Sequence, residues 1–297
     1  MLFFPWKEGL HMINHYLKLT QIRDGESLYH YTKVSSLMNI LKTRSLFATK
    51  SSFLNDTNEM DYIIHVTADV IRKLSNQAWI DLLMKHVVNT MEEYKRHDTF
   101  VLSLSTDKDS ITLWSEFGEQ TGYSVAFDGE KLIDEIDKAQ EIYCHGCCIY
   151  SETLQNELVH NLITQQIPVK EGMSFPEIMN EAMHDEDCKV FQDYCHRLHK
   201  ILNAYAMFFK QQEFEAEKEY RIVFRNPDKK KILFREKEGF LLPYIVIDLS
   251  DQKRLPLSRI TVAPKNHTDL ARKGMIQYLD SLGYDVPVEL SRLKLRY

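Results

Sequence analysis

The spacing of apolar residues places short strands toward the two ends of the chain and helices between them. Alternating or short apolar runs predict strands over 28–31, 45–49, 100–105 and 123–127, and an extended segment over 142–150. The same signal returns later, predicting strands over 220–224, 232–234, 244–247 and 260–263 and an extended piece over 286–290. This order of elements favours an α+β fold over a regular alternation of strand and helix.

Helical spacing is the second pattern along the chain. It predicts helices after an N-cap at Thr32, near 59–76 and 78–97, from 111 to 117 behind a cap at Asp109 or Ser110, and from Thr268 to Leu282. Every periodic segment from about 152 to 212 is helical, which indicates a helical insertion. Residues 1–26 lack a clear period and are interpreted as an N-terminal appendage, so one domain spans 27–297 and includes the insertion.

Composition narrows the function classes. The 297 residues are 44% hydrophobic and carry a net charge of −6, which argues against sequence-independent phosphate binding. No Walker or dinucleotide glycine loop is present. There is no apolar run long enough to span a bilayer and no secretory signal, so we expect a cytoplasmic protein that does not engage membranes. An odd count of five cysteines suits reduced thiols.

Two groups of residues are candidates for a metal site. Cys144 and Cys147, together with Cys195 and His199 on one predicted helix, allow a zinc site to be drawn. Buried thiols that act as small hydrophobes are the competing interpretation, and no metal is expected. The polar segment 55–59 lacks the glycine of a calcium loop, so we interpret it as a turn that caps the next helix.

Two ionisable residues on predicted strands are candidates for chemistry. His30 lies beside Tyr31 on a short apolar strand, where a lone histidine is usually a core residue with a satisfied hydrogen bond. Glu219 is the last of four alternating glutamates and enters the apolar strand 220–224. The earlier ones, Glu213 and Glu215, fit a solvated loop, whereas Glu219 is also compatible with a role in a cleft.

Several stretches of this sequence together resemble one bacterial protein family. They are LYHYT (28–32), FLNDTNEM (53–60), FVLSLST (100–106), ITLWSEFGEQTGYSVAFD (111–128), EAEKEYRIVF (215–224) and ELSRLKLR (289–296). The chain is similar to DUF2971, a family of uncharacterised proteins. That family in turn resembles the ADP-ribosyltransferase superfamily, which implies two small packed β-sheets that form a cleft for NAD.

The resemblance also implies roles for particular residues. His30 matches the first-strand residue that orients the ribose and nicotinamide, Ser103 or Ser105 matches the second-strand position, and Glu219 matches the catalytic glutamate. Tyr29 or Tyr31 offers an aromatic face for nicotinamide. Arg221 and the tail residues Arg292, Lys294 and Arg296 are candidate pyrophosphate ligands, with a solvated strand face as the alternative for the tail.

The expected function is therefore NAD binding with transfer or cleavage of ADP-ribose, toward an unknown protein or nucleic-acid acceptor. Proteins of this kind are often toxins or phage-defence effectors. Two alternatives stay open. The first is a catalytically inactive binding or regulatory module of the same fold, and the second is a zinc-stabilised interaction protein.

Overall fold

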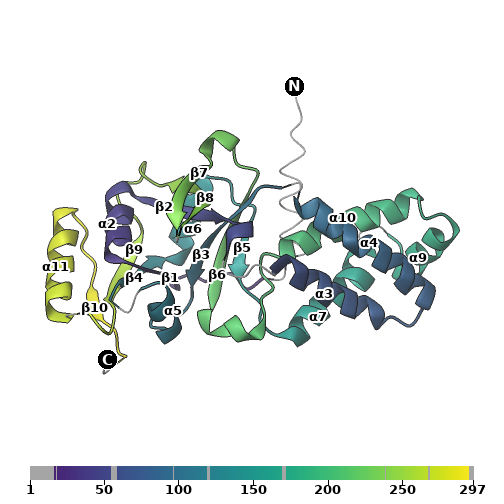
Figure 1. Cartoon of the computed structure of the whole chain (residues 1–297), viewed down its shortest axis with the longest axis horizontal. Helices are drawn as coiled ribbons and strands as arrows, with labels where there is room; N and C mark the ends of the chain where they lie inside the picture. Colours follow the sequence, from purple (N-terminus) through teal and green to yellow (C-terminus); the bar gives the residue numbers. More distant parts are fainter. Residues whose placement is uncertain are drawn as a thin grey trace. The chain divides into compact units, whose positions relative to one another are not determined.

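The chain divides into two compact units in the computed structural model, which describes residues 17, 19–54, 59–95, 97–118, 121–168, 172–237, 239–266 and 268–293. The helical unit comprises Met1–Leu19, Leu54–Asp98 and Cys148–Gln212, and the sheet unit comprises Thr20–Phe53, Thr99–Cys147 and Glu213–Tyr297 (Figure 1). The expected insertion at 152–212 thus shares its unit with an earlier part of the chain.

The sheet unit confirms the expected mixture of strands and helices. Its strands are β1 (Ser27–Thr32), β2 (Ser45–Lys50), β3 (Thr99–Ser105), β4 (Tyr123–Asp128), β5 (Cys144–Cys147), β6 (Glu219–Arg225), β7 (Leu233–Lys237), β8 (Phe240–Asp248), β9 (Leu257–Val262) and β10 (Val288–Leu290). Its α-helices are α2 (Val34–Thr43), α5 (Ile111–Glu116), α6 (Gly129–Ala139) and α11 (Thr268–Ser281), and short 3₁₀ turns occur at Ser51–Phe53, Gln212–Glu217 and Lys229–Lys231.

Two helix starts test the N-cap residues that were expected from the sequence. Ser110 caps α5 as expected, since its hydroxyl accepts a hydrogen bond from the amide of Leu113. The cap expected at Thr32 is wrong, because β1 continues through that residue and α2 follows Lys33, which makes no side-chain capping bond. The helix α2 therefore starts without a side-chain cap.

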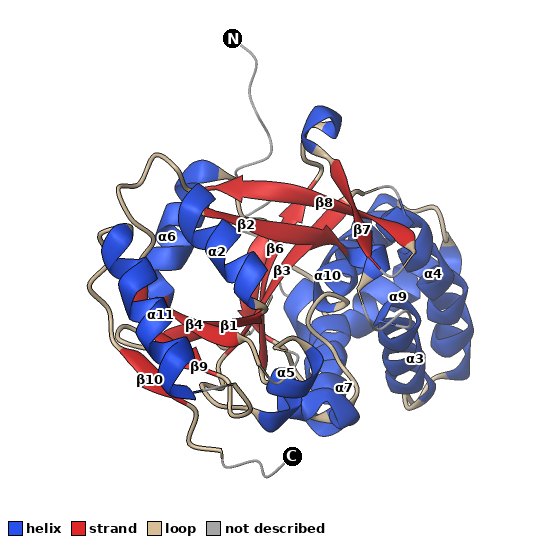
Figure 2. Cartoon of the chain, turned by 60° about the vertical axis from the view of Figure 1, so that its left-hand side comes forward, coloured by secondary structure: helices blue, strands red, loops and turns tan. Residues whose placement is uncertain are grey.

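The ten strands form one hydrogen-bonded sheet rather than two separate small sheets. Along its main path the order is β10-β9-β4-β1-β3-β2-β8-β7, and β6 joins β3 to β5. β3 is the branch point: β6 pairs along its whole length on one edge. On the other edge β2 pairs with Phe100 and Val101, and β1 pairs only with Ser105. The sheet therefore divides at β3 into a β1-β4 arm and a β2-β8 arm (Figure 2).

Apolar residues cover the two faces of this sheet in separate clusters. The large cluster contains Leu28 of β1, Val125 of β4 and Phe224 of β6, and helices α2, α6 and α11 contribute to it. A small cluster contains Tyr31 and Trp114, with Tyr29 packed against it. Neighbouring positions of β1 thus contribute to different clusters, as strand alternation requires.

The helical unit contains the expected all-helical segment. Its elements are α3 (Glu59–Arg72), α4 (Gln77–Lys95), α7 (Glu152–Asn161), a π-helical turn (Leu162–Gln166), α9 (Phe175–His184) and α10 (Lys189–Tyr205). α9 begins with a capping box in which Ser174 and Glu177 satisfy each other's backbone amides, and Pro176 lies in its first turn. Across the described residues, none of the helices combines the length and apolarity needed to cross a bilayer.

Candidate functional site

Three of the predicted site residues lie directly opposite one another on adjacent strands. Tyr29 of β1 pairs with Ser105 of β3, and Ser105 pairs with Glu219 of β6. Directly paired residues of antiparallel strands project from the same face of a sheet. These three side chains therefore form one row across β1, β3 and β6.

The next row of β3 adds two more predicted residues to the same face. Ser103 pairs with Arg221, and each lies two positions from a member of the first row. Tyr31 lies two positions from Tyr29 and shares its face for the same reason. We call Tyr29, Ser103, Ser105, Glu219 and Arg221 the glutamate face.

His30 is the predicted residue that the structure separates from this group. It pairs directly with Val125, which is fully buried in the large cluster together with Leu28. Its side chain accordingly leaves β1 on the face opposite to Glu219. The sheet therefore does not bring His30 and Glu219 together on one surface.

The imidazole of His30 lies where β1 and β2 leave β3. It makes a hydrogen bond to the backbone of Ser103, in the part of β3 that neither β1 nor β2 pairs with among the described residues. Burial, with a smaller contribution from the Arg235 cation, lowers the pKa of His30 from 6.5 to about 4. The ring is therefore neutral at pH 7. It bonds to the backbone of β3 at a position where β3 has no paired strand on that edge among the described residues.

Glu219 and Arg221 form a buried ion pair on the glutamate face. The Nε atom of Arg221 lies 2.9 Å from Oε1 of Glu219, and only 2% and 8% of the two side chains are exposed. Position 219 was expected from the sequence to present a carboxylate at the strand start, and it does so from a buried position. The apolar residues Tyr220, Ile222 and Phe224 alternate with this pair and enter the core on the other face.

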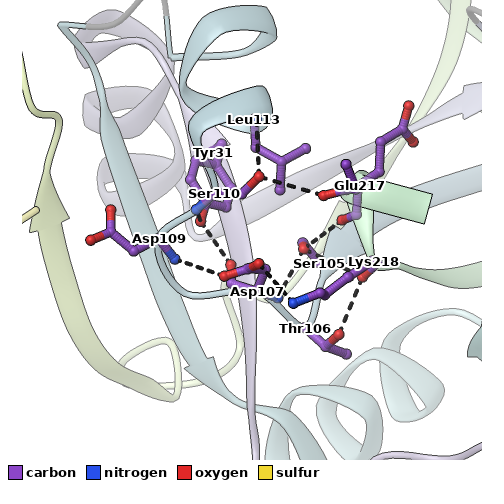
Figure 3. A network of polar contacts seen from close by, with 10 residues as sticks. Tyr31, Ser105, Thr106, Asp107, Asp109, Ser110, Leu113, Glu217 and Lys218 are labelled. Carbon is purple, nitrogen blue, oxygen red and sulfur yellow. Dashed lines mark hydrogen bonds and ion pairs between the residues drawn. The ribbon is translucent and has the colours of Figure 1, made fainter. Parts of the chain in front are cut away.

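The hydrogen bonds of the two serines distinguish them. The hydroxyl of Ser105 donates to the carbonyl of Glu217 at 2.8 Å and accepts from the amide of Asp107 at 3.0 Å, so it fastens two loops (Figure 3). Ser103 is half-buried, and its hydroxyl has no hydrogen-bond partner among the described residues. Ser103 is therefore the serine with an available hydroxyl on this face.

Tyr31 belongs to a structural network rather than to an open aromatic surface. Its hydroxyl donates to the carbonyl of Asp107 at 2.7 Å and accepts from the amide of Ser110 at 3.0 Å (Figure 3). Its ring packs edge-on against Trp114 with centroids 4.7 Å apart. Burial raises the pKa of Tyr31 well above its usual range. Tyr29 is half-buried and is the better candidate for contact with a ligand.

Two residues next to this network were not predicted as site residues. Asp109 accepts hydrogen bonds from the indole of Trp114, the hydroxyl of Ser291 and the amide of Arg292, at 2.7–2.8 Å, and so ties the C-terminal segment to α5. Lys218 precedes Glu219 with a positive φ of 43° and reaches Asp107 at 3.1 Å. No spacing rule in the sequence links these positions, which lie more than a hundred residues apart.

The remaining predicted groups are the candidate metal ligands and the cations of the C-terminal tail. Among the residues that the structure describes, no cluster of three or more histidine, cysteine or acidic side chains is arranged to hold a metal ion. Burial raises the thiol pKa of both Cys144 and Cys195 to about 12, so both stay protonated. The polar segment 55–58 and the tail cations Lys294 and Arg296 lie outside the described residues.

Comparison with known proteins adds one finding to this geometry. Residues 113–222 match the family model DUF2971, a protein of unknown function. The match begins in α5 and ends in β6, so it includes Glu219 and Arg221 and excludes β1 and β3. It supports the family resemblance noted from the sequence. No curated protein and no solved structure matched the chain.

Proposed function

We propose that the sheet unit binds NAD on the glutamate face and transfers or cleaves its ADP-ribose group. The observation that carries the proposal is the placement of the buried carboxylate of Glu219 beside Ser103, Ser105 and Tyr29 on one face. This face lies next to the point where the two arms of the sheet leave β3. The resemblance to ADP-ribosyltransferases supplies the choice of NAD as the substrate.

The chemistry of the reaction explains why a fixed carboxylate matters. Cleaving the bond between ribose and nicotinamide develops positive charge on the ribose, so a nearby carboxylate interacts more strongly with the transition state than with the ground state. The Arg221 guanidinium, 2.9 Å away, stabilises the charged form of Glu219 at a buried position. A group that does not have to reorganise during the reaction is the most effective kind of electrostatic catalyst.

The other residues take roles that follow from their contacts. The available hydroxyl of Ser103 is placed to bind a ribose hydroxyl, and the half-buried ring of Tyr29 supplies an apolar surface for nicotinamide. His30 acts as a positioning residue in this proposal, since its bond to the Ser103 backbone fixes the strand that carries that hydroxyl. This differs from the catalytic role that the resemblance implied for His30.

A second candidate function has its own supporting observation. Glu219 already forms an ion pair with Arg221 in the folded protein. The positive charge of the arginine offsets part of the negative potential that the carboxylate would present to a ligand. This arrangement suits a binding or regulatory module of the same fold that recognises a nucleotide without cleaving it. The two functions differ in whether nicotinamide is released.

The decisive experiment incubates the full chain with NAD labelled in both nicotinamide and adenine and follows released nicotinamide and labelled macromolecules. Glu219→Gln is expected to reduce nicotinamide release by about 10²–10³-fold, the usual effect of removing one electrostatic catalyst. Glu215→Gln, an exposed glutamate four residues earlier, is the matched control and should retain activity. Ser103→Ala should weaken NAD binding measured by thermal shift.

The possible outcomes separate the two candidates. Release of nicotinamide that depends on Glu219 supports the enzyme. An NAD-dependent melting shift without any nicotinamide release supports the binding module. If NAD gives neither a shift nor a product, the proposal is overturned.

A further inference from the structure

The β7-β8 hairpin exposes a concentration of large apolar side chains. Leu233 and Phe234 of β7 are 43% and 61% exposed, and Phe240 and Leu241 of β8 are 44% and 66% exposed. Strand pairing places Phe234 and Leu241 on one face of the hairpin and Leu233 and Phe240 on the other. Large apolar groups that gather on an exposed surface are a common feature of interaction sites, so this hairpin is a candidate for one.

The outer edge of β7 is the last edge of the sheet. In the described part of the chain β7 pairs with β8 alone and ends the strand order. An edge strand presents alternate N–H and C=O groups that can pair with another strand. The exposed side chains therefore surround a row of backbone groups that is suited to an added strand.

The charge around this edge is positive, although the whole chain is acidic. Residues 228–240 carry five cations, Lys229, Lys230, Lys231, Arg235 and Lys237, against three carboxylates, Asp228, Glu236 and Glu238. The three consecutive lysines form an exposed turn directly before β7. The net charge of the chain is −6, so this local excess favours an anionic partner over another copy of the same surface.

We infer that the edge of β7 binds an extended protein segment in which acidic and apolar residues alternate. Arg235 and Lys237 share one face of β7, and Phe234 lies on the other. A strand added beside them places acids opposite the two cations and an apolar side chain opposite Phe234, and such cross-strand pairs are the favourable ones. This inference does not depend on the proposed NAD chemistry.

The same pattern makes two other occupants less suitable. Pairing two copies of β7 antiparallel about Arg235 would set that arginine against its equivalent and Phe234 against Glu236, which is unfavourable at both positions. A nucleic acid would satisfy the lysines, but it has no strand to pair with the β7 backbone. An acidic extended segment satisfies the charge, the apolar groups and the backbone together.

The test measures binding of the full chain to a short fluorescent peptide of alternating aspartate and valine by anisotropy. Two control peptides are used: one with lysine in place of aspartate, and one N-methylated at alternate amides, which cannot pair with a strand edge. The double variant Arg235→Glu/Lys237→Glu is expected to weaken binding about tenfold or more, and added salt should weaken it too. Lys42→Glu/Lys273→Glu makes the same charge change at exposed helical positions and should have little effect.

A second pair of variants tests the apolar contact without a charge change. Phe234→Ser should weaken peptide binding, whereas Leu270→Ser, at a 75% exposed position of α11, should not. The inference is overturned if the aspartate peptide does not bind, if either control peptide binds equally well, or if Phe234→Ser has no effect. It is also overturned if a single-stranded RNA binds this edge in place of the peptide, or if Phe234→Ser dissociates a dimer of the free protein.

Discussion

Replacing Arg221 by methionine tests the buried ion pair of the glutamate face. The substitution keeps a long apolar side chain but leaves the carboxylate of Glu219, of which 8% is exposed, without the guanidinium at 2.9 Å. Removing one partner of a buried pair costs about 3–5 kcal/mol, because the remaining charge has lost its solvent and its counter-charge. We therefore expect Arg221→Met to lower the free energy of unfolding of the sheet unit by about 3–5 kcal/mol.

The double variant Glu219→Gln/Arg221→Met shows whether the loss comes from the carboxylate charge that has lost its arginine. Since it removes both charges, it should be more stable than the sum of the single variants predicts, by about 2 kcal/mol. Lys131→Met is the control in the same unit: Lys131 of the Lys131–Asp128 pair is 72% exposed, so its loss should change the free energy of unfolding little.

Urea unfolding followed by tryptophan fluorescence measures these free energies. With Trp6 and Trp79 replaced by phenylalanine, the signal comes from Trp114, which is fully buried in the sheet unit. The chain has two compact units, and a single local probe avoids mixing their transitions. A loss below about 1 kcal/mol for Arg221→Met, or additivity in the double variant, would refute the reasoning.

Two further predictions concern β1. Because the pKa of His30 falls from 6.5 in the unfolded chain to about 4 in the folded protein, the unfolded chain binds more protons between these values. The contribution of His30 to the free energy of unfolding is therefore fully present above pH 6.5 and decreases as the pH drops toward 4. About 2 kcal/mol of it is lost between pH 7 and pH 5. His30→Gln should remove this part of the pH dependence in urea unfolding, and an unchanged pH slope in the variant would contradict the assignment. Tyr31→Phe leaves the amide of Ser110 without its acceptor at 3.0 Å and should lower the free energy of unfolding by about 1–3 kcal/mol. Tyr29→Phe is the control and should lower it little, because the hydroxyl of Tyr29 has no bond among the described residues. Equal losses in the two variants would count against the network.

Local patterns in the sequence predicted most elements but not their partners. Each predicted strand has a counterpart in the sheet unit, since alternation and β-branched residues are properties of short segments. Helix α6 was not predicted, although Leu132, Ile133 and Ile136 have helical spacing and Asp128 caps the amide of Lys131. Pairings between distant segments, such as Ser105 with Glu219, depend on tertiary structure that no local window contains.

Register explains why the site was predicted only in part. A shift of one residue in strand pairing transfers a side chain to the opposite face, so the residues 29, 30 and 31 could not be assigned to a face from the sequence. The pairing of Tyr29 with Ser105 decides the question and places His30 with the core residue Val125. A histidine next to an aromatic strand residue is thus compatible with two opposite roles.

The branch at β3 connects these two faces. β6 pairs with β3 along one whole edge and holds β3 in the sheet. On the other edge, β1 and β2 can therefore diverge from each other and leave the middle of β3 unpaired among the described residues. The imidazole of His30 bonds to the backbone of Ser103 at this opening, while the hydroxyl of Ser103 belongs to the glutamate face. His30 can therefore act on that face only through the strand between them. Under the proposed function, a substitution of His30 should therefore alter the position of Ser103 and weaken NAD binding there, whereas a substitution of Glu219 should reduce nicotinamide release.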